Sequence, residues 1–155
     1  MADSNRCACE GGTTLVFACS GGADVGEISD RAARLMDERD AGSMYCLAGV
    51  GGRVSGIVKS TEAADHVIMI DGCPLDCGRR TLEEASISGF RHVRVTDLGF
   101  KKGDSPPTDE AVERVAAAAC AALGVPWESP GRHAEVTTEA AAPAASRPHA
   151  RCCGG

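Results

Sequence analysis

Short runs of apolar residues alternate with helix-like patterns between residues 13 and 125 of this 155-residue chain. The apolar runs are rich in β-branched residues and are bounded by turn-forming residues, which is typical of buried strands. They predict four strands, at residues 14–18, 43–47, 66–70 and 92–96. The third run, with the sequence His-Val-Ile-Met-Ile, is the clearest strand of the four.

Each of these strands is followed by a segment with helical periodicity or helix-start signals. After the first strand, apolar residues recur at i, i+4, i+7 and i+8 from Ile28. Asp24, three residues before Glu27, is a plausible capping arrangement ahead of this helix. A shorter helix is expected around residues 54–58 and another over residues 74–85. The last helix is expected to begin after Thr108 as N-cap residue and to stop at Gly124.

Four strand–helix units in alternation predict a mostly parallel sheet with helices on both faces. The expected fold is a small three-layer α-β-α domain of flavodoxin- or Rossmann-like type. Of the possible strand orders we favour 2-1-3-4, because its switch point lies between strands 1 and 3, where Cys19 and Cys73 emerge. An order of 3-2-1-4 would move the crevice between strands 1 and 4 and leave Cys73 away from it.

The composition changes on both sides of this domain, which is expected to span residues 13–125. Residues 1–12 are short and polar, carry Cys7 and Cys9, and are predicted to be flexible. Residues 126–155 consist largely of Pro, Ala, Glu, Thr and Ser with almost no large apolar side chains. Such a segment buries too little to offset its ordering entropy, so we expect a disordered tail ending in Cys152-Cys153-Gly-Gly.

Charge and cysteine content narrow the class of function. The net charge of −6 argues against a nucleic-acid or anionic-membrane partner, which needs clustered Lys and Arg. No stretch approaches the roughly 18 apolar residues of a membrane span, and residues 1–12 lack the apolar core of a signal peptide. The chain has nine cysteines, and in the reducing environment of the cytoplasm a cysteine-rich pattern indicates metal binding or catalysis rather than disulfides. We therefore expect a cytoplasmic protein.

The positions of four cysteines carry the functional prediction. Cys19 follows the first predicted strand, Cys46 lies near the end of the second, and Cys73 follows the third. Cys77 lies four residues beyond Cys73, so that on a helix the two would share a face. Because ligands of open α/β sheets bind outside the carboxyl ends of the strands, we expect these four thiols to converge there. Four thiolates match a tetrahedral zinc site, with other soft ions as alternatives.

Local sequence supports this interpretation for Cys73. Gly72 allows a tight turn before it, and Pro74 after it is favoured at the first position of a helix. Cys73 would then lie at a helix N-terminus, where the helix dipole favours a thiolate. A cysteine can equally be a small buried hydrophobe, and we expect this for Cys120 within its alanine-rich helix.

The stretch Ile70-Asp71-Gly72-Cys73-Pro74-Leu75-Asp76-Cys77 resembles the signature of the DGC-domain proteins. The similarity extends to Cys19-Ser20-Gly21, to Cys46-Leu47-Ala48-Gly49 and to Asp97-Leu98-Gly99 with Lys101 after the fourth strand, and so covers roughly residues 13–125. The resemblance implies zinc binding through Cys19, Cys46, Cys73 and Cys77, and it implies no particular reaction.

Two further thiol pairs lie outside this core, Cys7 with Cys9 and Cys152 with Cys153. Our hypothesis is that they receive or hand over a soft ion, because thiolates select such ions. The implied partners are the metal ion and a metal- or sulfur-donor or acceptor protein.

Enzymatic alternatives are less favoured, and no catalytic residue is assigned. A phosphatase-like loop needs an arginine six residues after Cys19, where this chain has Val25, and no Cys-x-x-Cys motif indicates a dithiol enzyme. The glycine-rich turn at residues 49–53 fits neither common nucleotide-binding motif. A sulfur or selenium carrier, or a redox enzyme, with Cys19 or Cys73 as nucleophile remains the alternative function.

Overall fold

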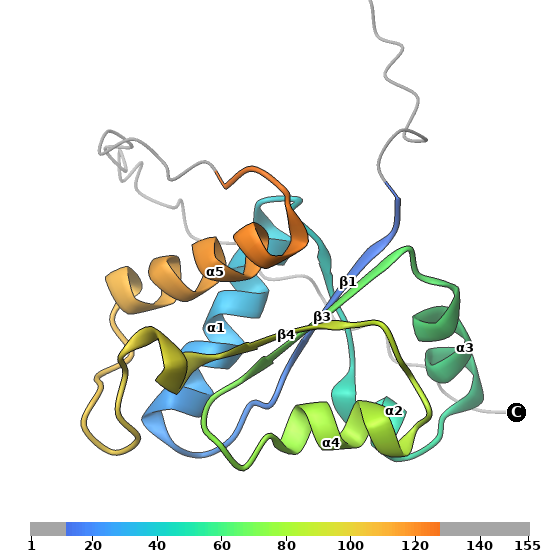
Figure 1. Cartoon of the computed structure of the whole chain (residues 1–155), viewed down its shortest axis with the longest axis horizontal. Coiled ribbons are helices and arrows are strands. Elements are labelled where there is room, and N and C mark those ends of the chain that lie inside the picture. The colour runs from blue at the N-terminus through green and yellow to red at the C-terminus, as the bar shows by residue number, and fades with distance from the viewer. Residues whose placement is uncertain (1–11, 128–155) are drawn as a thin grey trace, which may run out of the picture.

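The computed structural model describes residues 12–127, which form a four-stranded, fully parallel sheet with helices on both faces (Figure 1). The predicted strand order 2-1-3-4 is confirmed. The strands are β1 (Thr14–Ala18), β2 (Ser43–Met44), β3 (His66–Asp71) and β4 (Arg91–Arg94). Cys7, Cys9, Cys152 and Cys153 lie outside the described residues, so the predictions for them stay predictions.

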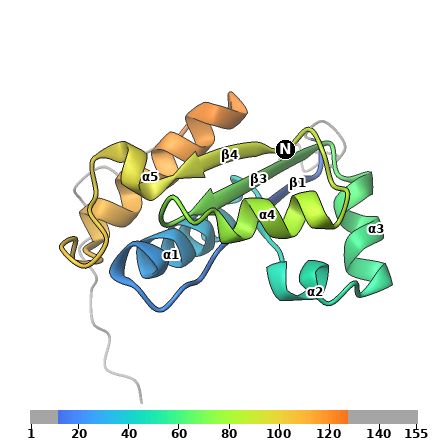
Figure 2. The same cartoon turned by 60° about the horizontal axis from the view of Figure 1, so that its bottom comes forward.

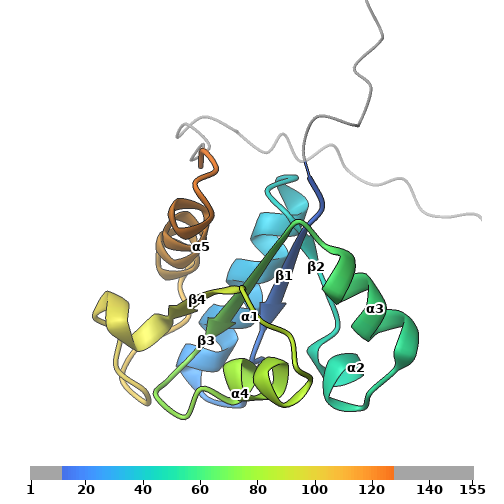
Figure 3. The same cartoon turned by 45° about the vertical axis from the view of Figure 1, so that its right-hand side comes forward.

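The helices divide between the two faces of the sheet, as Figures 2 and 3 show from two further directions. One face carries α1 (Asp24–Glu38) and α5 (Asp109–Leu123), which pack against each other. The other face carries α2 (Leu47–Gly51), α3 (Ser55–Ala63) and α4 (Cys77–Glu84). A short 3₁₀ helix, η1 (Val95–Leu98), follows β4. No helix among residues 12–127 is long and apolar enough to span a membrane.

Alternation along the strands builds two separate cores. Val16 of β1 packs on the side of α1 and α5, whereas its neighbour Phe17 packs on the side of α2 and α4. In β3, Ile70 and Met69 divide in the same way. Because successive side chains of a strand point to opposite faces and both faces are covered, the central strands are apolar without interruption. This is why the sequence shows them as continuous apolar runs.

The second strand is shorter than predicted, and a helix takes its place. β2 ends at Met44, although the backbone N–H of Tyr45 still donates to the carbonyl of Val16 at 2.8 Å. Leu47, predicted as the last strand residue, is instead the first residue of α2. The sulfur of Cys46 accepts the backbone N–H of Gly49 at 3.3 Å and so caps this helix.

The two long helices begin in different ways. Thr108 caps α5 as predicted, because its hydroxyl accepts the N–H of Ala111 at 3.2 Å. Asp24 does not precede α1 but is its first residue. Its carboxylate accepts the N–H groups of Gly103 and Ser105, both at 2.8 Å, which lowers the pKa of Asp24. This contact ties the loop between η1 and α5 to the start of α1.

Candidate functional site

The four predicted cysteines all lie on the side of the sheet where the strands end, as expected. Cys19 directly follows β1, Cys46 lies two residues after β2, Cys73 lies two residues after β3, and Cys77 is the first residue of α4. We call this group of loops the cysteine edge. All four thiols are free; Cys46 and Cys77 are exposed, and Cys19 and Cys73 are partly buried. Cys120, by contrast, is buried in the core, and burial raises the pKa of its thiol.

Cys19 is attached to the end of β3. Its sulfur accepts the backbone N–H of Gly72 at 3.2 Å, and its own backbone N–H donates to the carbonyl of Ile70 at 3.1 Å. The thiol also lies 3.8 Å from the hydroxyl of Ser29, which in turn donates to the Ile70 carbonyl at 2.6 Å. Cys19 therefore contacts Gly72, the residue immediately before Cys73.

The segment from Cys73 to Cys77 differs from its prediction. The helix begins at Cys77 and not at Pro74. A turn precedes it, in which the N–H of Asp76 donates to the carbonyl of Cys73 at 3.1 Å and Asp76 adopts a left-handed backbone conformation with φ of 51°. Cys73 thus lies outside the helix, neither at its N-terminus nor on a common helical face with Cys77.

Asp71 explains why α4 starts where it does. Its carboxylate, only 1 % exposed, accepts the backbone N–H groups of Gly78 at 2.8 Å and Arg79 at 2.9 Å. These are two of the N–H groups that a helix leaves without an internal partner at its start. Nε2 of His92, from β4, lies 3.0 Å from the same carboxylate. The acceptor at the N-terminus of α4 is therefore the side chain of Asp71 rather than that of Cys73.

An ion pair between Arg94 and Asp76 also holds the turn. The guanidinium of Arg94, at the end of β4, donates to both carboxylate oxygens of Asp76 at 2.8 and 2.7 Å. Arg94 also donates to Asp97. The Arg94 guanidinium holds the pKa of Asp76 below its usual value, although partial burial acts in the opposite direction. The residue next to Cys77 is in this way anchored to β4.

Sequence reasoning missed this network as a part of the site. Among the described residues, Asp71, Asp76 and His92 are the group of potential metal ligands whose ligand atoms all lie within 4.8 Å of one another. The carboxylate oxygens already have N–H and guanidinium partners, and Nε2 of His92 lies against Asp71, so a cation there would compete with Arg94. We interpret the group as a brace that holds the Cys73–Cys77 turn.

Gly72 is required for close packing at this point of the edge. A Cβ atom added to it would lie 2.9 Å from the backbone carbon and oxygen of Val25, at the start of α1. Glycine therefore lets the end of β3 approach α1 closely, and this approach is what brings the Gly72 N–H to the sulfur of Cys19.

Replacement of Gly72 by alanine should accordingly destabilise the fold by about 1–3 kcal/mol, the usual cost of overpacking against backbone. Urea unfolding with an unchanged slope measures it. Gly56→Ala in α3 is the matched control, because a Cβ there meets nothing within 4 Å, and it should be neutral or slightly stabilising. Equal stabilities of the two variants would contradict the close approach of β3 and α1.

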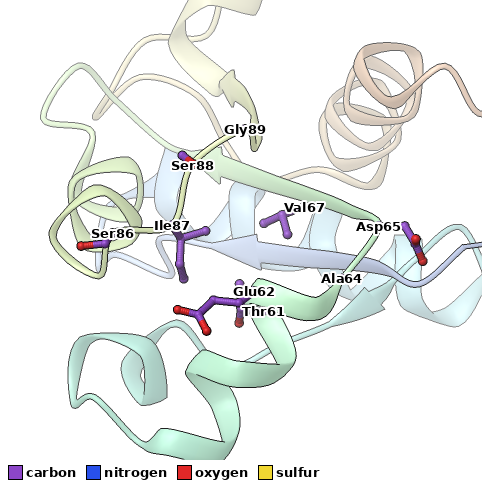
Figure 4. A pocket seen from close by; sticks show the side chains of 9 residues that line it. All are labelled: Thr61, Glu62, Ala64, Asp65, Val67, Ser86, Ile87, Ser88 and Gly89. Carbon is purple, nitrogen blue, oxygen red and sulfur yellow. The ribbon is translucent and has the colours of Figure 1, made fainter.

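A hollow of about 190 Å³ lies away from the cysteines, near the amino ends of β3 and β4. Figure 4 shows its lining, which includes Thr61, Glu62 and Asp65 near the start of β3 and Ser86 after α4. It contains no cysteine, and its acidic side chains give it no chemistry shared with the cysteine edge.

Comparison with known proteins identifies the family. A family model described as the DGC domain matches residues 15–119, which include all four cysteines of the edge. Among curated proteins, the chain is 33% identical over 88 residues to the anaerobic and virulence modulator AnvM of Pseudomonas aeruginosa, covering 57% of this chain and 67% of that protein. No solved structure matches the chain. The chain therefore belongs to the DGC-domain family.

Proposed function

We propose that this chain binds a thiophilic metal ion, Zn(II) in the first place, through Cys19, Cys46, Cys73 and Cys77. The proposal is supported by their common position, since three parallel strands deliver Cys19, Cys46 and Cys73 to one edge of the sheet and α4 starts with Cys77. Thiolates are preferred zinc ligands, and four of them make a tetrahedral set. The exposure of Cys46 and Cys77 allows an ion to reach the edge from solvent.

The observation that carries the proposal is the contact between the Cys19 sulfur and the Gly72 N–H at 3.2 Å. It joins two cysteine-bearing loops from different strands and holds one sulfur beside the backbone that leads into Cys73. The sulfur of Cys46 likewise accepts a backbone N–H. A sulfur that accepts one N–H keeps further lone pairs for an ion, so these contacts are compatible with metal binding.

The edge needs some rearrangement to bind an ion with all four thiols. No three of their sulfur atoms all lie within 4.8 Å of one another in the described structure. The brace of Asp71 and Asp76 limits the movement of the turn, so the adjustment falls on the exposed side chains of Cys46 and Cys77.

Zinc content of the purified, reduced full-length chain tests the proposal. The Cys73→Ser variant should lose the ion bound at the edge, measured by metal analysis and by native mass spectrometry. Cys120→Ala is the matched control, because it also removes one thiol but from the buried core of α5, and it should keep the ion. Equal zinc content in wild type and Cys73→Ser would overturn the proposal.

Mass spectra of the chain as purified, recorded before any reduction, address the alternative of a sulfur or selenium carrier. A carrier would be purified in part with an additional sulfur or selenium atom on Cys19 or Cys73, removable by a reductant. An adduct of this kind together with unchanged zinc content in Cys73→Ser would favour the carrier function over metal binding.

A further inference from the structure

The four thiols of the cysteine edge differ in how far they are open to solvent. Cys19 and Cys73 are partly buried, and we call them the inner pair. Cys46 and Cys77 are exposed, and we call them the outer pair. In a tetrahedral zinc site with zinc–sulfur bonds of about 2.3 Å, the sulfur atoms lie about 3.8 Å apart. Because no three sulfur atoms of the described edge all lie within 4.8 Å of one another, the outer pair is not already assembled with an inner thiol.

The two helices that carry the outer pair lie side by side and run in the same direction. α2 packs against α4, as Figures 2 and 3 show. A Cβ atom added to Gly51 of α2 would lie 3.4 Å from the side-chain methyl group of Thr81 in α4. The guanidinium of Arg53, which follows α2, donates to the carbonyl of Glu84 at the end of α4. Later residues of one helix thus meet later residues of the other, and the two helix starts are neighbours as well.

These neighbouring starts place the two exposed thiols next to each other. Cys77 lies four residues before Thr81 and so shares the face of α4 that meets α2. Cys46 is the N-cap of α2, and its sulfur is oriented by the backbone N–H of Gly49 at 3.3 Å. The brace holds the backbone that leads into Cys77. The outer pair is therefore a two-thiol unit on a fixed framework, open to solvent.

We propose that the outer pairs of two copies of this chain hold one thiophilic ion between them, Zn(II) in the first place. Cys46 and Cys77 of each copy then complete the tetrahedral set of four thiolates. A two-fold arrangement brings the same surface of both copies together, so each supplies two of the four ligands. Binding releases one proton from each of the four thiols and changes no oxidation state.

This inference rests on the proposed function, because the same exposed thiols serve as zinc ligands in both. It adds a partner, a second copy of the chain, and a dependence on zinc supply. When zinc is scarcer than the chain, one ion joins two outer pairs without the rearrangement that the single-chain site needs. When zinc is sufficient, each outer pair joins its own inner pair and the copies separate.

Charge and shape at the outer pair fit this partner. One zinc ion with four thiolates carries an excess of negative charge, and the exposed Arg80, three residues after Cys77 on α4, offers one guanidinium from each copy to balance it. Leu75, which is 61% exposed, can meet its counterpart in the second copy. One leucine on each side is far less than the roughly 800 Å² per partner of a stable interface, so the copies should associate only through the ion.

Zn(II) titration of the reduced full-length chain, followed by light scattering and native mass spectrometry, tests the shared ion. At half an equivalent of zinc, the main species should be a dimer with one ion, and EDTA should return it to monomers. At one equivalent, monomers with one ion each should replace it. Monomers at every zinc level would overturn the inference and leave the proposed function standing. Dimers that never take more than one ion would do the reverse, and a chain that binds no zinc would overturn both.

Paired variants show which thiols hold the shared ion. The variant with Cys46→Ser and Cys77→Ser should form no zinc-dependent dimer. The variant with Cys19→Ser and Cys73→Ser is the matched control, because it also removes two thiols of the edge, and it should form the dimer even in excess zinc. Cys73→Ser alone, the milder change, should behave in the same way, with half the zinc content of the wild type. A dimer in the outer-pair variant, or its absence in Cys73→Ser, would overturn the inference.

The cysteines outside the described residues need a control of their own. A full-length variant with serine in place of Cys7, Cys9, Cys152 and Cys153 keeps all the thiols of the cysteine edge. It should form the same dimer at half an equivalent of zinc. A dimer that disappears in this variant would show that the terminal thiols hold the ion, and the outer pairs would then have no part in it.

Discussion

Replacing Asp71 by alanine should destabilise the protein by about 2–4 kcal/mol, since it removes the acceptor of the buried Gly78 N–H and of the partly buried Arg79 N–H. The carboxylate is 1 % exposed, accepts the backbone N–H groups of Gly78 and Arg79, and lies 3.0 Å from Nε2 of His92. Water cannot replace an acceptor in this place without opening the contact between α4 and β3. Urea unfolding of the full chain should show a lower midpoint with an unchanged slope.

Two further variants serve as comparisons for Asp71→Ala, one that removes the charge of Asp71 and one that removes an exposed carboxylate elsewhere. Asp71→Asn keeps one acceptor oxygen but turns an NH₂ group towards donors, so its loss should be intermediate. Asp104→Ala removes an exposed carboxylate and should change stability by no more than about 0.5 kcal/mol. If Asp71→Ala were as stable as Asp104→Ala, α4 would not depend on this carboxylate for its start.

The overall fold follows from local patterns in the sequence. β1 and β3 are apolar on both faces, and the helical periodicity after each of them predicts a covered parallel sheet. The strand order depended in addition on placing Cys19 and Cys73 at a switch point, and the order β2-β1-β3-β4 agrees with it. The location of Cys19, Cys46 and Cys73 after the strands could be predicted as well, because the apolar runs mark where the strands end.

The starts of the helices were harder to predict, because the side chains that cap them do not stand at the usual distance in the sequence. Capping rules look for a polar side chain within about three residues of the helix start, but Asp71 precedes Gly78 by seven residues. Pro74 satisfies the rule for a first helical residue and so pointed to a helix that starts three residues too early. At α2 the cap is the sulfur of Cys46, and cysteine is not among the common N-cap residues.

The brace of the cysteine turn could not be predicted from one sequence. His92 lies 21 residues from Asp71, and Arg94 lies 18 residues from Asp76. They meet because β3 and β4 are neighbours in register, with Asp71 opposite Arg94. The sequence marks Asp71, which precedes Gly72, as a common turn former. The sheet places Asp71 and Asp76 against His92 and Arg94 from the adjacent strand.

The pair of Arg94 and Asp76 should make stability depend on pH in a defined direction. Because Arg94 holds the pKa of Asp76 below its unfolded value of about 3.9, the stabilisation is complete above about pH 4 and is lost as the pH falls through the lowered pKa. The Arg94→Met variant keeps the length of the side chain and removes its charge. It should be less stable by about 2 kcal/mol at pH 7, the value of hydrogen bonds to charged groups.

The difference between wild type and Arg94→Met should therefore shrink as the pH falls below 4, because protonation of Asp76 removes the same ion pair in the wild type. Asp76→Asn supplies the matched partner, since asparagine tolerates the left-handed conformation at this position. In a double-mutant cycle at pH 7, the second substitution should cost much less than it does alone. Additive losses, or a difference that stays constant down to pH 3, would mean that Arg94 stabilises the turn through packing or through Asp97 and not through the carboxylate beside Cys77.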